Sequence, residues 1–153
     1  MKTGLAATLT AVAIWVAFAL PVLADRDPSP DGDAALRVVA ERLSLRDIEV
    51  HPGAEGAGLT GRLPGGEWLD LVFHRDGSLE GLEAGAHRLA PVSEVTSVLP
   101  GPLLRAERFP ADAMFERIGL GVDGYAIAGR DHNGRRFEVD YDRDGRVKRW
   151  RSE

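Results

Sequence analysis

The chain of 153 residues contains no cysteine. This absence excludes a disulfide framework, a lipid-modified N-terminal cysteine and any thiolate metal ligand. Packing alone must therefore stabilise the fold. Basic residues are also too few for a nucleic-acid-binding surface, because 19 Lys and Arg stand against 24 Asp and Glu. General nucleic-acid binding needs a basic footprint, so we expect no nucleic-acid partner.

Catalytic motifs are missing as well. No serine stands in a Gly-x-Ser-x-Gly context, and no glycine-rich segment ends in Gly-Lys-Ser or Gly-Lys-Thr. The four histidines include no pair at the spacing of zinc ligands; they are His51, His74, His87 and His132. We therefore expect no enzyme active site, no bound cofactor and no zinc.

One apolar segment stands near the N-terminus. Residues 5–20 are uncharged and mostly apolar, Lys2 precedes them, and Val22-Leu-Ala24 suits cleavage by a signal peptidase. The run is shorter than the about 20 residues of a membrane span. We predict a cleaved signal peptide at 1–24, a periplasmic or secreted protein, and no membrane contact after cleavage. The mature chain would keep 18 basic and 24 acidic residues, a net charge of −6.

The C-terminal segment, residues 124–153, has the pattern of three short strands joined by two tight turns. Asn133-Gly134 suits a two-residue type I′ hairpin, in which both residues have positive φ. Asp144-Gly145 repeats this turn signal. Between the turns, charged residues alternate with apolar ones, as in a strand with one buried face. The apolar residues are Phe137, Val139 and Tyr141.

An internal duplication is indicated by the segment 59–82, which matches the C-terminal segment when it is shifted by 68 positions without a gap. Asp76-Gly77 then falls on Asp144-Gly145, and Gly65-Gly66 falls on Asn133-Gly134. The inward-facing residues correspond too, since Phe137, Val139 and Tyr141 are matched by Leu69, Leu71 and Phe73. Turns and apolar positions agree together, which favours a repeat.

A polar leader and a helix precede the first of these strands. Residues 25–32 are polar and rich in proline. Asp33 is a candidate N-cap for a helix whose apolar stripe has the spacing i, i+3, i+4, i+7. That stripe consists of Leu36, Val39, Ala40 and Leu43. Residues 47–50 alternate like a short strand, and residues 51–58 have the composition of a loop.

The middle of the chain should supply the second copy's helix and first strand. A helix with Ser93 as its cap would end at Pro100, and its apolar face would hold Val92, Val95 and Leu99. Residues 113–120 leave two alternatives open. The duplication predicts a strand there, whereas local propensity allows a helix that begins at Asp112.

The closing thirty residues also carry a family resemblance. Their pattern is Gly-Tyr, Arg-Asp, Gly-Arg, Glu-Val, Tyr-Asp and Asp-Gly-Arg-Val at set intervals. It rests on Gly124, Tyr125, Arg130, Asp131, Gly134, Arg135, Glu138, Val139, Tyr141, Asp142, Asp144, Gly145, Arg146 and Val147. With a helix ahead of small antiparallel strands in an exported chain, this pattern resembles the PepSY-domain family. The match covers the last thirty residues well and residues 59–82 less well.

The resemblance implies an α+β fold of two tandem PepSY-like units, each a helix packed on a small antiparallel β-sheet. With 1–24 as signal peptide and 25–32 as flexible leader, the units would span 33–84 and 85–153. PepSY-like domains are not enzymes and have no catalytic residues to carry over. The family implies a protein-binding role, including inhibition or regulation of peptidases.

The acidic turn near the C-terminus resembles the opening of a calcium loop. Such loops place oxygen ligands at positions 1, 3 and 5 and glycine at position 6, which here are Asp140, Asp142, Asp144 and Gly145. Position 12 needs a bidentate glutamate, and Arg151 stands there instead. A plain hairpin is therefore favoured over a calcium site.

Three apolar residues are the candidates for binding a partner: Trp68, Val72 and Trp150. If the neighbouring apolar residues of the strand face the core, Trp68 and Val72 face away from it. An outward tryptophan is either covered by the other half of the chain or available to a partner, because exposed aromatics are enriched at interaction hot spots. Packing of the two halves is the favoured alternative, since each half alone can bury little surface. Trp150 presents the same alternatives.

The leading hypothesis is a non-enzymatic, exported protein-binding module whose partner is another periplasmic or secreted protein. A calcium- or ligand-responsive sensor that uses the turn at 140–144 is the alternative. An enzyme would need titratable groups that converge in a cleft, and the sequence does not place any.

Overall fold

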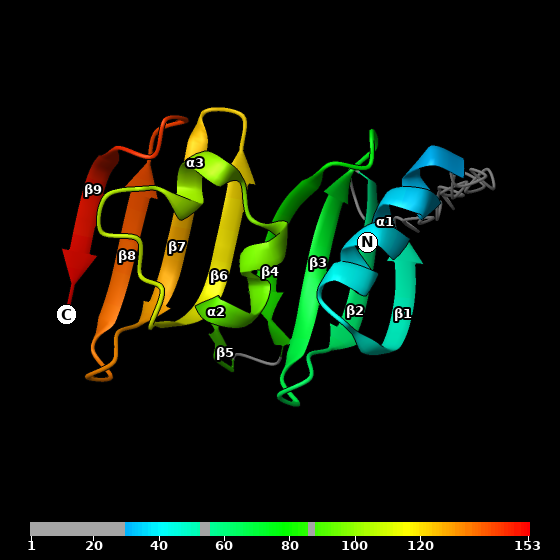
Figure 1. Ribbon diagram of the computed structural model, residues 1–153, viewed down its shortest axis with the longest axis horizontal. Helices are drawn as coiled ribbons and strands as arrows, with labels where there is room; N and C mark the ends of the chain where they lie inside the picture. Colours follow the sequence, from blue (N-terminus) through cyan, green and yellow to red (C-terminus); the bar gives the residue numbers. More distant parts are fainter. Residues whose placement is uncertain (1–29, 53–55, 86–87) are drawn as a thin grey trace, which may run out of the picture.

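Nine antiparallel strands form one sheet in the computed structural model, which describes residues 30–52, 56–85 and 88–153. Neighbouring strands follow the chain in the order β1-β2-β3-β4-β6-β7-β8-β9, and the short β5 pairs with β6 beside this path (Figure 1). The strands are β1 (Arg46–Pro52), β2 (Gly56–Arg62), β3 (Trp68–His74), β4 (Leu79–Ala84), β5 (Ala90–Pro91), β6 (Met114–Gly121), β7 (Gly124–Arg130), β8 (Arg136–Tyr141) and β9 (Val147–Ser152).

The helices lie on one face of this sheet (Figure 1). They are α1 (Pro30–Arg42), α2 (Val92–Val95), the 3-10 helix η2 (Thr96–Val98) and α3 (Gly101–Leu104). The predicted stripe of α1 is confirmed, because Leu36, Ala40 and Leu43 are buried and Val39 packs against them. None of the helices in the described ranges has the length and hydrophobicity needed to span a bilayer.

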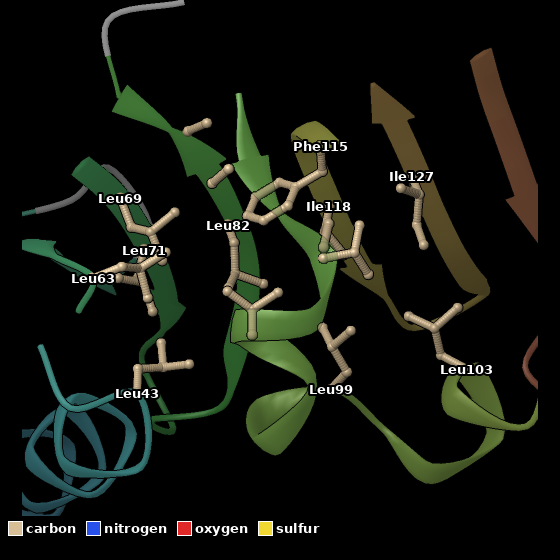
Figure 2. Close-up of a cluster of buried hydrophobic side chains, with 14 of the residues drawn as sticks. Leu43, Leu63, Leu69, Leu71, Leu82, Leu99, Leu103, Phe115, Ile118 and Ile127 are labelled. Carbon is tan, nitrogen blue, oxygen red and sulfur yellow. The ribbon is translucent and has the colours of Figure 1, made fainter. Parts of the chain in front are cut away.

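A single hydrophobic core runs between the helices and the sheet, from α1 to the C-terminal strands. Strand alternation supplies it, as predicted, because Leu69, Leu71 and Phe73 of β3 are fully buried while the residues between them are not. Figure 2 shows how Leu82 and Ile118 face each other on neighbouring strands, with Leu99 approaching from the helical layer. The middle segment therefore completes the core that the strands begin.

The prediction of two tandem units, each a helix on its own small sheet, is wrong. Strand β4 pairs with β6, so the strands of both predicted units belong to one continuous sheet. A free sheet edge exposes unpaired N–H and C=O groups, and joining two such edges satisfies them. Among the described residues, only α1 is a helix of several turns, since α2 and α3 have four residues each.

The junction between β4 and β6 is short. It consists of three residue pairs, Gly81 with Gly119, Leu82 with Ile118, and Glu83 with Arg117. Beyond Gly81 and Gly119 the two strands are not paired with each other. We call this junction the seam; its length leaves room for a cavity at one end.

The strands of the two halves are offset by the same 68 positions as the matching sequence segments. Strands β2 and β4 begin at residues 56 and 79, and β7 and β9 begin 68 residues later, at 124 and 147. The inward-facing residues of β3 and β8 correspond in the same way. The origin of the two halves by duplication stays a prediction. Such a duplication would not make the halves independent folding units.

The hairpin turns differ from the predicted type I′ geometry. In each of four turns a glycine N–H donates to the carbonyl three residues earlier, as Gly134 does to Asp131 at 2.9 Å. Gly134 has a φ of +79°, but Asn133 is not among the residues with positive φ. These are longer loops in which glycine alone takes the left-handed conformation. The same arrangement recurs at Gly66, Gly77 and Gly145.

Three regions differ from the local predictions, and a fourth settles an open alternative. Asp33 lies inside α1, which already includes residues 30–32 of the predicted leader, so Asp33 is not an N-cap. Of the predicted loop at 51–58, residues 51–52 and 56–58 belong to strands. The helix expected from Ser93 is divided into α2 and η2, and its N-cap is Pro91 without a side-chain bond. Residues 114–121 are a strand, as the duplication predicted.

Candidate functional site

The face of the sheet opposite the helices carries the most distinctive set of side chains. Within the described ranges no helix covers it (Figure 1). Because side chains alternate along a strand, every second residue of the central strands lies on this face. We call it the open face. Its residues include Gly58, Thr60, Arg62, Trp68, Asp70, Val72, Gly81, Glu83, Arg117, Gly119, Ala126, Ala128, Arg136, Glu138, Asp140, Arg149 and Arg151.

A groove of about 600 Å³ crosses the middle of the open face. Strands β3, β4, β6, β7 and β8 supply its walls, and the loop before β5 adds Arg88. Small molecules bind in protein clefts of about 300–1,000 Å³, but this groove is lined mainly by charged side chains. The charged ones are Asp70, Glu83, Arg88, Glu116, Arg117, Arg136 and Glu138.

Two carboxylates meet on one side of the groove. Asp70 on β3 lies directly opposite Glu83 on β4, and like charges in that position destabilise a sheet. The Thr60 hydroxyl donates a hydrogen bond of 2.7 Å to Asp70, and His51 Nε2 lies 3.1 Å from the same hydroxyl. Among the described residues, neither carboxylate has a basic side chain within ion-pair distance.

The opposite side of the groove is electrically balanced. Arg136 pairs with Glu116 at 3.2 Å, Arg151 with Glu138 at 3.2 Å, and Arg149 with Asp140 at 2.8 Å. Each pair joins neighbouring parts of the sheet and is partly exposed, so each contributes at most about 1 kcal/mol to stability. Around β3 and β4 the charges are mixed, because Arg117 lies directly opposite Glu83 across the seam and Arg88 also lines the groove.

A strip of small residues runs beside the groove. Gly81, Gly119 and Ala126 lie in one row across β4, β6 and β7. A Cβ built on Gly119 would meet only the Ala126 Cβ, at 3.9 Å. Side chains of a partner could therefore approach the backbone closely at this row.

Trp68 and Val72 both lie on the open face; Val72 adjoins this strip, opposite Gly81, and Trp68 lies at the start of the same strand, opposite Arg62. Val72 is 39% exposed. The Arg62 guanidinium lies 4.9 Å from the centroid of the Trp68 ring, and a Cβ on Gly85 would come within 2.8 Å of the Trp68 Cβ. Arg62 therefore lies over the ring, and Gly85 approaches the Cβ and backbone of Trp68. The two halves join edge to edge through β4 and β6, and the role of Trp68 in binding a partner stays a prediction.

Trp150 lies on the other face of the sheet. It is opposite Val139, a core residue, and its ring stacks on Phe137 with centroids 5.7 Å apart. The Arg108 guanidinium covers it at 4.4 Å. The structure thus brings two of the three candidate residues together and separates the third, which closes one end of the core.

The three aspartates of the calcium-like turn have other partners. Asp140 pairs with Arg149, and Asp144 lies 3.7 Å from Arg146. Asp142 accepts hydrogen bonds of 2.9 Å from the backbone N–H groups of Asp144 and Arg146, which closes the hairpin. Across the described residues, no three His, Cys, Asp or Glu side chains converge as metal ligands.

Two further turns use an aspartate in a similar way. The hydroxyl and the N–H of Ser78 donate to Asp76 and lower the pKa of that carboxyl. Burial opposes ionisation of Asp131, but the N–H groups of Arg135 and Asn133 more than offset it and lower the pKa of Asp131. These carboxylates close turns rather than form a site.

The histidines are separated as well. His51 belongs to the open face, His74 Nδ1 lies 3.6 Å from Glu80, and His132 lies in a turn beside Asn133. His87 lies outside the described residues.

Sequence reasoning placed Asp70 on the outward side of its strand, but the sequence could not show that Asp70 lies opposite Glu83 or that Arg117 lies nearby. Only the pairing of β3, β4 and β6 does that.

No family model matches the chain, and no curated protein matches it. Several solved structures align with most of the chain. A Bacteroides vulgatus protein described as periplasmic and of unknown function has a TM-score of 0.47 at 18% identity, covering 82% of this chain and 95% of its own. A Bacteroides thetaiotaomicron protein described as calcium-regulated and periplasmic has a TM-score of 0.46 at 12% identity, covering 82% and 94%.

A third structure, a BLIP-like protein from Bacteroides fragilis, has a TM-score of 0.38 at 10% identity and covers 83% of this chain and 87% of its own. These values are too low to carry a function from any of the three to this chain. They show no family for it, and the PepSY resemblance stays a prediction.

Proposed function

We propose that this protein is an exported, non-enzymatic binding module, periplasmic or secreted, that holds a partner protein on the open face of its sheet. One observation carries the proposal. The open face combines an outward tryptophan, an exposed valine, a strip of glycine and alanine, and two adjacent carboxylates that form no ion pair with a described residue, all without a covering helix in the described ranges (Figure 1). Protein interfaces are built from such aromatic anchors with a polar rim.

The two edges of the sheet are less suited to a partner strand. Edge strand β1 is interrupted by a register shift between Arg46 and Glu49, by the positive φ of Asp47 and by Pro52. Edge strand β9 carries Lys148 among its exposed residues. Bulges, prolines and charged side chains are the devices by which proteins block pairing at an edge. The face therefore supports docking better than either edge.

The partner is a protein that places a lysine or arginine against Asp70 and Glu83 and apolar side chains on Val72 and Trp68. A cation there would relieve the repulsion between the two carboxylates, and complementary charge steers association. Exported peptidases are the partner class that the PepSY resemblance suggests. Inhibition would follow if docking blocked the entrance to an active site.

The test begins with the purified protein as bait against the exported proteins of the producing organism. A captured protein is then purified, and its affinity is measured by calorimetry for the wild-type chain and for Val72→Glu and Trp68→Ala. Loss of a hot-spot contact costs about 2 kcal/mol or more, so we expect each variant to raise Kd by at least about tenfold.

Val38→Glu is the matched control, because Val38 is also exposed, at 47% against 39% for Val72, but lies on α1. It should leave Kd unchanged. Equal affinity of all variants, or equal weakening by Val38→Glu and Val72→Glu, would overturn docking on the open face. The double variant Asp70→Asn with Glu83→Gln tests separately whether the partner places a lysine or arginine at these carboxylates. It should weaken binding more at low salt than at high salt, because salt screens the attraction between charges.

A further inference from the structure

A second cavity lies on the helix side of the sheet, at the end of the seam. Strands β4 and β6 lie side by side at the centre of the sheet (Figure 1) and are unpaired beyond Gly81 and Gly119. There the last residue of α1, the helix η2 and the turns after β3 and β6 surround an open pocket of about 350 Å³. None of its lining residues lines the groove of the open face.

The wall of this seam pocket is mainly apolar. Leu79 and Leu120 come from the diverging strands, Tyr125 from β7, Val98 from η2, and Val122 from the turn after β6. The first four are half-buried against the core, whereas Val122 is 72% exposed. An apolar residue with that exposure at the mouth of an apolar pocket extends the surface that a ligand can cover.

The polar groups of the pocket are positive or neutral. Arg42 and His74 line it, and no aspartate or glutamate does, although acidic residues outnumber basic ones in the chain. The Ser97 hydroxyl donates to the Arg42 carbonyl at 3.2 Å and so ties the end of α1 to η2. Among the described residues, no carboxylate lies within ion-pair distance of the Arg42 guanidinium.

We propose that the seam pocket binds a small amphipathic carboxylate, with its hydrocarbon part between Leu79, Val98 and Leu120 and its carboxylate at Arg42. Guanidinium groups bind carboxylates through parallel hydrogen bonds. The volume lies at the lower end of the range of small-molecule sites, about 300–1,000 Å³, which suits a chain or ring of modest size. The ligand site is independent of protein docking on the open face.

Octanoate and octanamide are the probes, because they share a hydrocarbon chain and differ in charge. Titration calorimetry of the purified protein should give one saturable octanoate site and an affinity for octanamide about tenfold lower, as expected for one charge-assisted contact. Arg42→Gln should lower octanoate affinity to that of octanamide and leave octanamide unchanged. Val122→Glu should weaken octanoate by at least about tenfold.

Arg37→Gln is the matched control, since Arg37 is exposed on the same helix and does not line the pocket. It should leave both affinities unchanged. The substituted side chains are exposed, so the variants should keep the melting temperature of the wild type. Absence of saturable octanoate binding at millimolar concentration, or equal effects of Arg42→Gln and Arg37→Gln, would overturn the proposal. Binding to the open face is measured separately, so the two proposals fail independently.

Discussion

At the scale of single residues, Tyr141 has the most perturbed ionisation. Burial raises its pKa to about 12, and the nearby Arg108 offsets this only in part. Its hydroxyl donates to the Arg108 carbonyl at 3.3 Å. Between the ordinary value of 10.0 and about 12, the unfolded chain loses the proton that the folded chain keeps. The contribution of Tyr141 to stability should therefore be constant below pH 10 and be lost as pH rises through that window.

Tyr141→Phe tests this account. Below pH 10 the variant should lose about 1 kcal/mol, the net value of one hydrogen bond. Above pH 10 the difference should shrink, because phenylalanine has no proton to lose. Urea unfolding from pH 8 to 11.5 measures both effects. An equal pH slope in the variant and the wild type would contradict the assignment to Tyr141.

The two tryptophans show that tertiary neighbours decide whether an aromatic ring lies on an outward face or covers the core. Trp68 and Trp150 were both candidates for an outward surface, yet one lies on the open face and the other covers Phe137. Each has an arginine against its ring. A hydropathy pattern shows that an apolar residue breaks the alternation, but not which layer of the molecule lies over it.

At the scale of elements, the four glycine turns allow a controlled comparison. Gly134 and Gly145 have similar φ values, +79° and +85°. A Cβ on Gly134 would meet nothing within 4 Å, whereas one on Gly145 would lie 2.5 Å from the Pro102 carbonyl oxygen and 3.2 Å from Ala106. The hairpin between β8 and β9 is thus packed against the segment around α3.

Alanine at the two positions should therefore have unequal effects. Gly134→Ala should cost about 1–2 kcal/mol, the penalty of the left-handed conformation. Gly145→Ala adds a backbone clash and should cost at least about 1 kcal/mol more, in the range of overpacked sites. Thermal or urea unfolding of the two variants checks the order. Equal losses would show that the hairpin does not support α3.

The acidic turn between β8 and β9 yields a prediction about calcium. Because Asp140, Asp142 and Asp144 already bind arginines or backbone N–H groups, millimolar calcium should leave the melting temperature unchanged. A site occupied at a hundred times its Kd would stabilise the fold by about 2.7 kcal/mol. A rise in melting temperature with calcium that disappears in Asp144→Asn would restore the sensor hypothesis.

At the scale of the whole molecule, the seam makes the two halves one cooperative structure. Leu82 and Ile118 are fully buried and opposite each other on β4 and β6, and one core includes residues from both halves. Leu82→Ala should cost about 2–5 kcal/mol, as other large buried deletions do. It should lower the midpoint of a single unfolding transition.

Fluorescence and far-UV circular dichroism should follow that transition at the same urea concentration, in the wild type and in Leu82→Ala. Coincident curves are the mark of two-state unfolding. Two separated transitions, of which Leu82→Ala moves only one, would show that the halves fold independently despite the shared sheet.

Much of the local structure could be predicted because its causes are local. Leu69, Leu71 and Phe73 are buried, and Trp68 and Val72 point away from them, since side chains alternate along any strand. Turn positions followed from Asp-Gly and Gly-Gly pairs, although their type did not, because Asn133 also suits the longer loop. Residues 113–120 needed the duplication to be assigned as a strand, since their own propensities were divided.

The candidate site could be predicted only in part. Trp68 and Val72 were expected on an outward surface, and they lie on the open face. Trp150 was expected to share their role in binding a partner, but it lies on the other face of the sheet. Asp70 and Glu83 become neighbours because β3 pairs with β4, and Arg117 joins them because β4 pairs with β6. Such neighbours are remote in sequence, and no local pattern specifies them.

The sequence by itself determined which residues of each strand are apolar, where the chain turns and which stripe of α1 is buried, because period 2, period 3.6 and positive φ are properties of short segments. The tertiary structure decided that the two halves share one sheet, that the helices of the described ranges lie on one side of it, and that a pocket opens where β4 and β6 part. Those outcomes depend on which strand edges meet, and an edge can pair with any other edge whose hydrogen bonds and side chains fit. The open face and the seam pocket, the two surfaces proposed to bind, both arise from that choice.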